Sequence, residues 1–133
     1  MQNLKKLCEL ALLYAALSPC KKRQVGCVVV SQTGEVISYG FNHGYHQACS
    51  CDTHQGHKNP HALHAEVMAL DSTDPEIFKG ASIVLTHAPC DLGCTDLIIS
   101  KHLAAVYYMG IPSTRNGLSK LDIQNINHTH LGT

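Results

Sequence analysis

The chain has few aromatic residues and no net charge. Its 133 residues include no tryptophan, two phenylalanines and five tyrosines, and ten lysines and arginines balance ten aspartates and glutamates. Proteins that bind long nucleic acids usually carry a basic excess, because each neutralised phosphate contributes to affinity, and single strands also need aromatic rings for stacking. The sequence therefore favours a small-molecule ligand over a polymer.

The sequence also has no long apolar run, and we expect no signal peptide. The apolar stretch over residues 10–17 is far shorter than the roughly 20 residues that cross a membrane. Residues 1–9 lack the order of charge, apolar core and cleavage site that marks a signal peptide. The length suits one compact domain. We therefore expect a single cytoplasmic domain over residues 1–133 and no membrane partner.

Cysteine and histidine, by contrast, are abundant, with seven and ten copies. In a reducing compartment an odd number of cysteines is not expected to form a disulfide framework. Thiolate and imidazole are the groups with which proteins hold zinc. The composition therefore points to a metal site.

Hydrophobic periodicity predicts alternating helices and strands. Apolar spacing predicts helices over 4–17, 61–70, 90–102 and 118–126, and strands over 25–30, 36–41, 82–86 and 105–109. The first two strands form a hairpin around a turn at 32–34, and Pro60 suits the first turn of the second helix. This order is that of an α/β fold with a parallel crossover at its centre.

Two short segments carry the residues for chemistry. His64-Ala65-Glu66 opens one predicted helix, and Cys90 with Cys94 opens another. His64, Cys90 and Cys94 are three ligands for a tetrahedral zinc that leave the fourth position to water, which is typical of catalytic rather than structural zinc. Glu66 is close to the metal without being needed as a ligand, so it is a candidate acid/base.

These segments resemble the zinc-dependent cytidine and deoxycytidylate (dCMP) deaminase family, whose signature is H-x-E followed by P-C-x-x-C. The similarity covers roughly residues 5–110 and is greatest to the dCMP deaminase branch, with this chain a short, virus-like member. It includes Gln24-Val25-Gly26, Gly40-Phe41-Asn42, residues 64–70 and Val106-Tyr107-Tyr108. The resemblance implies a three-layer α/β/α fold with a mixed central sheet of four to five strands.

One feature departs from the family pattern. Three residues separate Cys90 from Cys94, where the family usually has two. Because a helix turns about 100° per residue, spacings of three and four both keep the two cysteines on one face. Gly93 can ease a local bulge between them. We therefore expect the metal site to be intact.

The resemblance also implies a reaction and a set of contacts. The expected reaction is hydrolytic deamination of a free cytidine nucleotide, dCMP to dUMP plus ammonia, in which Glu66 passes protons from water to the ring and the leaving amine. The backbone N–H of Ala65 would meet the pyrimidine carbonyl, and the backbone carbonyl of Ala88 the amino group. Asn42 would bind the sugar, or be a turn residue in a left-handed conformation. Arg23 and Arg115 are candidates for the 5′-phosphate, although the basic run at 21–23 also fits a solvated loop.

A second cluster lies in the long loop over residues 42–60 and beside it. Some dCMP deaminases hold a structural zinc there, and the resemblance implies Cys20, Cys49, His57 and His61 as its ligands, with Cys51 or His54 as substitutes. A metal would offset the entropy of closing such a loop. The alternative is a histidine-rich loop that is simply solvated.

Other functions fit parts of the pattern. One is a deaminase of another small heterocycle, and another is a deaminase of tRNA or single-stranded nucleic acid. A third is a non-catalytic, zinc-braced binding module in which His87 or Asp91 closes the metal site, but such a module has no use for Glu66.

Further expectations concern the tail and the surroundings of the protein. Relatives commonly end in a helix and a fifth strand, and here only polar residues follow position 126. We therefore expect the last strand to be very short or missing. The exposed sheet edge and the resemblance favour a homo-oligomer. The expected location is the cytoplasm, including that of an infected host cell.

Overall fold

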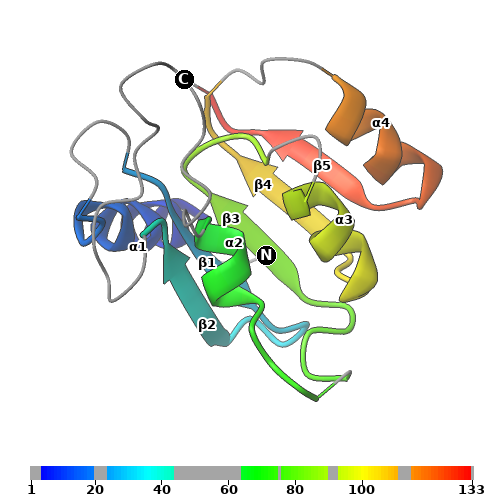
Figure 1. Cartoon of the computed structure of the whole chain (residues 1–133), viewed down its shortest axis with the longest axis horizontal. Coiled ribbons are helices and arrows are strands. Elements are labelled where there is room, and N and C mark those ends of the chain that lie inside the picture. Colours follow the sequence, from blue (N-terminus) through cyan, green and yellow to red (C-terminus); the bar gives the residue numbers. More distant parts are fainter. Residues whose placement is uncertain are drawn as a thin grey trace.

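A computed structural model describes residues 4–19, 24–43, 64–74, 76–89, 93–110 and 115–132. Its centre is a five-stranded sheet in the order β2-β1-β3-β4-β5 (Figure 1). The strands are β1 (Gly26–Val30), β2 (Val36–Phe41), β3 (Ser82–Leu85), β4 (Ala105–Tyr108) and β5 (Asn127–His130). The helices are α1 (Leu4–Ala16), α2 (Ala65–Ala69), α3 (Gly93–Ser100) and α4 (Asn116–Ile123).

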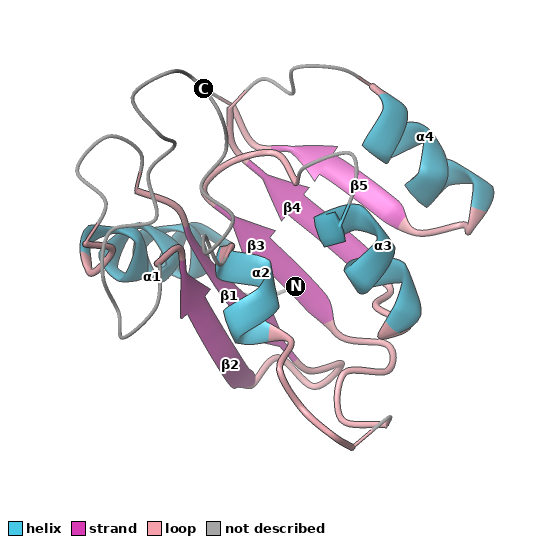
Figure 2. Ribbon diagram, in the orientation of Figure 1, coloured by secondary structure: helices cyan, strands magenta, loops and turns pink. Residues whose placement is uncertain are grey.

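Helices cover both faces of the sheet. Side chains of α2, α3 and α4 join one core cluster with Val29, Ile83 and Val106. Side chains of α1 join a second cluster with Val28, Val30 and Val84, which alternate with the first set along the same strands. Figure 2 shows α2 and α3 in front of the sheet. The arrangement confirms the predicted three-layer α/β/α architecture.

The antiparallel half of the sheet is the hairpin of β1 and β2 together with β3, which pairs with the other side of β1. All five residues of β1 are buried, as expected for a central strand covered on both faces. Gly34 closes the hairpin turn with a φ of 93°, a conformation that favours glycine. The predicted hairpin is thus confirmed.

The parallel half follows the predicted crossover. β3, α3 and β4 form one unit with parallel strands, and β4, α4 and β5 form the next. The sheet is therefore mixed, as predicted. The last strand exists despite its polar sequence Asn-His-Thr-His, because β4 supplies a full ladder of backbone partners over four positions. With four residues it is as long as β3 and β4, so the expectation of a very short or missing last strand was wrong.

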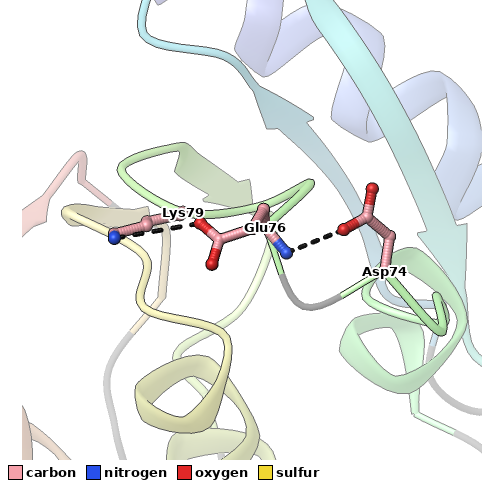
Figure 3. Close-up of polar contacts among 3 residues, drawn as sticks. All are labelled: Asp74, Glu76 and Lys79. Atoms are coloured by element: carbon pink, nitrogen blue, oxygen red, sulfur yellow. Dashed lines mark hydrogen bonds and ion pairs between the residues drawn. The ribbon is translucent and has the colours of Figure 1, made fainter.

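Polar contacts organise the connection from α2 to β3. The backbone N–H of Glu76 donates to the Asp74 carboxylate at 2.9 Å, and the Glu76 side chain lies 3.8 Å from the Lys79 ammonium (Figure 3). Both partners of this ion pair are exposed, so it contributes little stability. Nearby, the Lys101 ammonium donates to the carbonyl of Ser72 at 3.1 Å. The end of α3 is thereby joined to the segment that leaves α2.

Several predicted helix boundaries differ from those of the structure. The second helix was expected over 61–70 with Pro60 in its first turn, but His64 has an extended backbone (φ −78°, ψ 157°) and α2 begins at Ala65. The third helix, expected over 90–102, ends at Ser100, and its expected start lies outside the described residues. The fourth helix, expected over 118–126, spans Asn116–Ile123. No helix within the described ranges combines the length and the apolar character needed to cross a membrane.

Candidate metal and active site

Strand directions bring the two chemical segments to the same edge of the sheet. β2 and β3 both run antiparallel to β1, so their carboxyl ends point the same way. His64 precedes the helix that follows β2, and Cys94 lies in the first turn of the helix that follows β3. Open α/β sheets bind ligands at this edge. His64 and Cys94, which are 30 positions apart in the sequence, are therefore neighbours in the fold.

His64, Glu66 and Cys94 form the metal-capable cluster of the described residues. The Nδ1 of His64 lies 3.0 Å from the Sγ of Cys94. One carboxylate oxygen of Glu66 joins them, with all ligand atoms within 4.8 Å of one another. Two such donors on a tetrahedral zinc lie about 3.6 Å apart, so the observed separation of 3.0 Å would widen by about 0.6 Å to hold the ion. The nitrogen and sulfur donors thus fit zinc, with Nδ1 as the histidine donor.

The start of α2 explains how Glu66 reaches this cluster. His64 caps the helix without a side-chain hydrogen bond to it, and its ring lies against Cys94 instead. Glu66, two residues on, lies in the first turn and is only 4% exposed. Burying a carboxylate at this depth costs free energy unless the group is hydrogen-bonded or paired with a positive charge. Its position beside the donors suits proton transfer.

Cys27 lies behind Glu66, on β1. It is fully buried, and its thiol lies 3.4 Å from the backbone carbonyl oxygen of Ala65. Burial raises the pKa of the Cys27 thiol well above its ordinary value, and the Glu66 carboxylate acts in the same direction. A hydrogen bond from the backbone of Gly40 opposes them. The group therefore remains a neutral thiol.

Asn42 extends the pairing of β1 with β2 beyond their ends. Its backbone N–H donates to the carbonyl of Val25 at 3.2 Å, and its side-chain Oδ1 accepts from the N–H of Val25 at 2.8 Å. Its own carbonyl accepts from the Ser18 hydroxyl at 2.8 Å. Asn42 has no positive φ, so the left-handed turn reading was wrong. These three hydrogen bonds fix Asn42 at the end of β2.

Thr86 and His87 form a short relay where β3 ends. The N–H of Gly26 donates to the Thr86 hydroxyl at 3.0 Å, and that hydroxyl lies 2.9 Å from Nδ1 of His87. Either group can be the donor of this second hydrogen bond, because a hydroxyl has one proton and two lone pairs. His87 does not belong to the described metal-capable cluster, which disfavours it as a closing ligand.

The remaining predicted site residues fall into two groups. Ala65 is buried in the first turn of α2, and Ala88 is half-buried after β3. Arg115 is the exposed N-cap of α4, which contacts α3 and β5. The other predicted site residues lie outside the described residues: Cys90, Cys20, Cys49, Cys51, His54, His57, His61 and Arg23.

The sequence did not identify Cys27 and Gly40 as residues that support the site from beneath α2. Cys27 reads as a small core residue, and its burial is that of one. Its contact with α2 depends on which face of the sheet α2 covers, and hydrophobic periodicity alone does not show this. One signal was available in the sequence: the predicted hairpin of residues 25–30 and 36–41 brings Cys27 close to Gly40, its register partner in the structure.

Fold and site together define a zinc-binding deaminase domain. Residues 1–110 match the family described as the cytidine and deoxycytidylate deaminase zinc-binding region. The match covers most of the chain, so the chain belongs to this family, as its motifs predicted. The mixed sheet with flanking helices is the fold of the solved dCMP deaminases that it resembles.

Three individual proteins show which members of the family this chain resembles. The human deoxycytidylate deaminase is 29% identical over 108 residues, which cover 74% of this chain and 60% of the human protein. The chain thus spans about three fifths of the length of that curated relative. A dCMP deaminase of the cyanophage S-TIM5, solved with dCMP and dUMP, is 29% identical and superimposes with a TM-score of 0.80 over 98% of both chains. A deaminase–reductase of Thermotoga maritima is 28% identical, with a TM-score of 0.65 over 96% of this chain and 34% of that one.

Proposed function

We propose that the chain is a zinc-dependent hydrolytic deaminase that converts dCMP to dUMP and ammonia. The observation that carries this proposal is the buried Glu66 carboxylate beside the nitrogen and sulfur donors of His64 and Cys94. The similarity over nearly the full length to a phage enzyme solved with dCMP and dUMP supports the choice of substrate.

The chain's own residues have separate tasks in this reaction. His64 through Nδ1, Cys94 and Cys90 hold one zinc, which when bound lowers the pKa of water to about 7. Glu66 accepts one proton from water and passes it to N3 of the ring, and then moves the second proton of that water to the departing amine. Since Glu66 lies at the base of a helix packed on the sheet, its carboxylate is held at a fixed position through both transfers.

Substrate contacts follow from the same edge of the sheet. Ala65 begins α2, so its N–H has no acceptor within the helix and is assigned to the pyrimidine carbonyl. Ala88 presents its carbonyl to the amino group. Asn42, held by Val25 and Ser18, is assigned to the sugar. Arg23 and Arg115 are assigned to the phosphate.

The proposal has three further parts. A second, structural zinc is held by Cys20, Cys49, His57 and His61. The protein is a homo-oligomer, because β2 and β5 leave both edges of the described sheet unpaired. It works in the cytoplasm, where free nucleotides are available and thiols stay reduced.

Ammonia release from a panel of substrates tests the function. We expect turnover with dCMP, little with deoxycytidine, and a kcat lowered by about 10²–10⁴ in the Glu66→Gln variant, which keeps the size of the side chain but cannot transfer a proton. Turnover with tRNA alone, or with another amino-heterocycle alone, would contradict the proposal. Zinc binding by the wild type and by the Glu66→Gln variant, without turnover of any substrate by either, would indicate a binding module.

Metal analysis tests the number of zincs. We expect about two equivalents per chain, falling to about one in a Cys49→Ala plus Cys51→Ala variant. A single equivalent that this double substitution leaves unchanged refutes the structural zinc.

A further inference from the structure

The α2 helix does not stabilise itself. It has five residues, whereas isolated helices shorter than about 12 residues are marginal in water. Its position, and with it that of Glu66, therefore depends on what the sheet beneath it supplies.

The edge strand β2 holds α2 at several points. The Ser38 hydroxyl donates to the carbonyl of Ala69 at 2.5 Å, and the N–H of Phe41 donates to the Met68 sulfur at 3.4 Å. Gly40 has no side chain, and a Cβ there would overlap the carbonyl oxygen of Ala65. These contacts fix the end of the helix and let its first turn lie directly on the backbone of β2.

The central strand β1 adds a contact at the first turn itself. Cys27, the register partner of Gly40, points its thiol at the carbonyl of Ala65 from 3.4 Å. A backbone carbonyl has two lone pairs, so one can serve the helix while the other accepts the thiol proton. This carbonyl belongs to the peptide that joins Ala65 to Glu66. A shift of that peptide moves the Glu66 backbone directly.

The thiol is suited to this contact because it keeps its proton. Burial and the Glu66 carboxylate both raise the pKa of Cys27, and together they outweigh the opposing hydrogen bond from Gly40. At neutral pH the group is therefore a donor. An ionised sulfur would repel the carbonyl oxygen and the Glu66 carboxylate.

We propose that Cys27 is a positioning residue for Glu66: its thiol donates to the Ala65 carbonyl and thereby sets the first turn of α2 against the sheet. The contact between Cys27 and Ala65 is a feature of the fold and does not depend on the proposed function. Its catalytic consequence rests on the proposed function, in which Glu66 transfers protons. Misplacement of a catalytic group by about 1 Å can cost a hundredfold in rate, so even a weak thiol contact is measurable in kcat.

Three substitutions separate donation from packing. Cys27→Ala removes the donor and some volume. Cys27→Val keeps apolar bulk without a donor, and Cys27→Ser keeps a donor at a smaller size. Val29→Ala is the matched control, because Val29 is fully buried on the same face of the same strand and loses more volume.

Kinetics with dCMP give the first measurement. A hydrogen bond is typically responsible for a factor of about five to ten. We expect kcat to fall about tenfold in Cys27→Ala and Cys27→Val with KM within about twofold, and Cys27→Ser to recover to within about threefold of the wild type. Val29→Ala should lower the melting temperature and leave kcat near the wild-type value. A Cys27→Ser variant no better than Cys27→Ala, or an equal loss of kcat in Val29→Ala, overturns the proposal.

Amide hydrogen exchange gives a second measurement that does not need activity. The N–H groups of Met68 and Leu70 are hydrogen-bonded within α2. We expect Cys27→Ala to speed their exchange about fivefold relative to amides of β4, whereas Val29→Ala changes both regions together. Unchanged relative exchange in α2 refutes the contact itself. If the wild type does not turn over dCMP, the proposed function fails, and the exchange measurement alone decides the role of Cys27.

Discussion

Replacing Gly40 by alanine tests the reasoning about how Glu66 is placed. Gly40 does not have a positive φ, so alanine can adopt its backbone conformation without strain. The added Cβ would overlap the carbonyl oxygen of Ala65 and lie 2.9 Å from the N–H nitrogen of Ala69. Both atoms are helix backbone and cannot rotate away. The first turn of α2 must therefore move off the sheet.

The size of the effect follows from this geometry. Restoring ordinary contact distances requires a shift of about 1 Å, a displacement that can lower a rate by about a hundredfold. Overpacking costs about 1–3 kcal/mol of unfolding free energy. A protein with an ordinary stability of about 5–15 kcal/mol remains folded after that loss. We therefore expect a folded variant with about one hundredth of the wild-type kcat.

The assay measures dCMP turnover, melting temperature and bound zinc for Gly40→Ala and for a control, Gly34→Ala. The control has a φ of 93° with no atom within 4 Å of the added Cβ, so it loses about 1–2 kcal/mol through backbone strain without moving α2. We expect kcat to fall only in Gly40→Ala. A Gly40→Ala enzyme within about threefold of wild type, or an equal loss in the control, would falsify the reasoning.

Three further predictions concern single groups. Glu66→Gln should lower kcat by about 10²–10⁴, the range for a lost general acid/base, with zinc content unchanged; loss of zinc would make Glu66 a ligand. Cys94→Ala should weaken zinc binding by more than about a hundredfold, measured by competition with a chelator, whereas the half-buried Cys8→Ala serves as the control and should bind as the wild type does. The third prediction is a pH dependence. The folded state raises the pKa of Cys27 above the ordinary 9.0, so above pH 9 the unfolded chain loses a proton that the folded chain keeps. Stability is then complete below pH 9 and falls above it, by about 1.4 kcal/mol per pH unit more in the wild type than in Cys27→Ala; parallel curves from denaturant titrations contradict the burial of the thiol.

Local patterns predicted much of the fold. The β-branched run of β1 and the glycine turn after it predicted the hairpin, and the apolar spacing of residues 4–17 predicted α1 to within one residue. Boundaries near the site were less predictable. Pro60 suggested a helix start, whereas the ring of His64 lies against Cys94 and keeps that residue extended. A contact between distant segments decided the local conformation.

The polar tail shows a similar limit. Nothing in Asn-His-Thr-His predicts a strand by alternation, because an edge strand with little burial needs no apolar face. β5 forms because β4 presents unpaired backbone groups next to it. Pairing across the sheet outweighs local propensity here.

Without a structure, the segment His64-Ala65-Glu66 together with Cys90 and Cys94 determined the prediction of a zinc site with a carboxylate next to it. Residue type alone selects that chemistry, since few groups bind zinc or transfer protons at neutral pH. Only the tertiary structure decided that Nδ1 of His64 faces Cys94, that Glu66 is buried beside them, and that Cys27 and Gly40 lie beneath α2. These facts depend on strand direction and on which face of the sheet a helix covers, and both are set by packing between segments far apart in the chain.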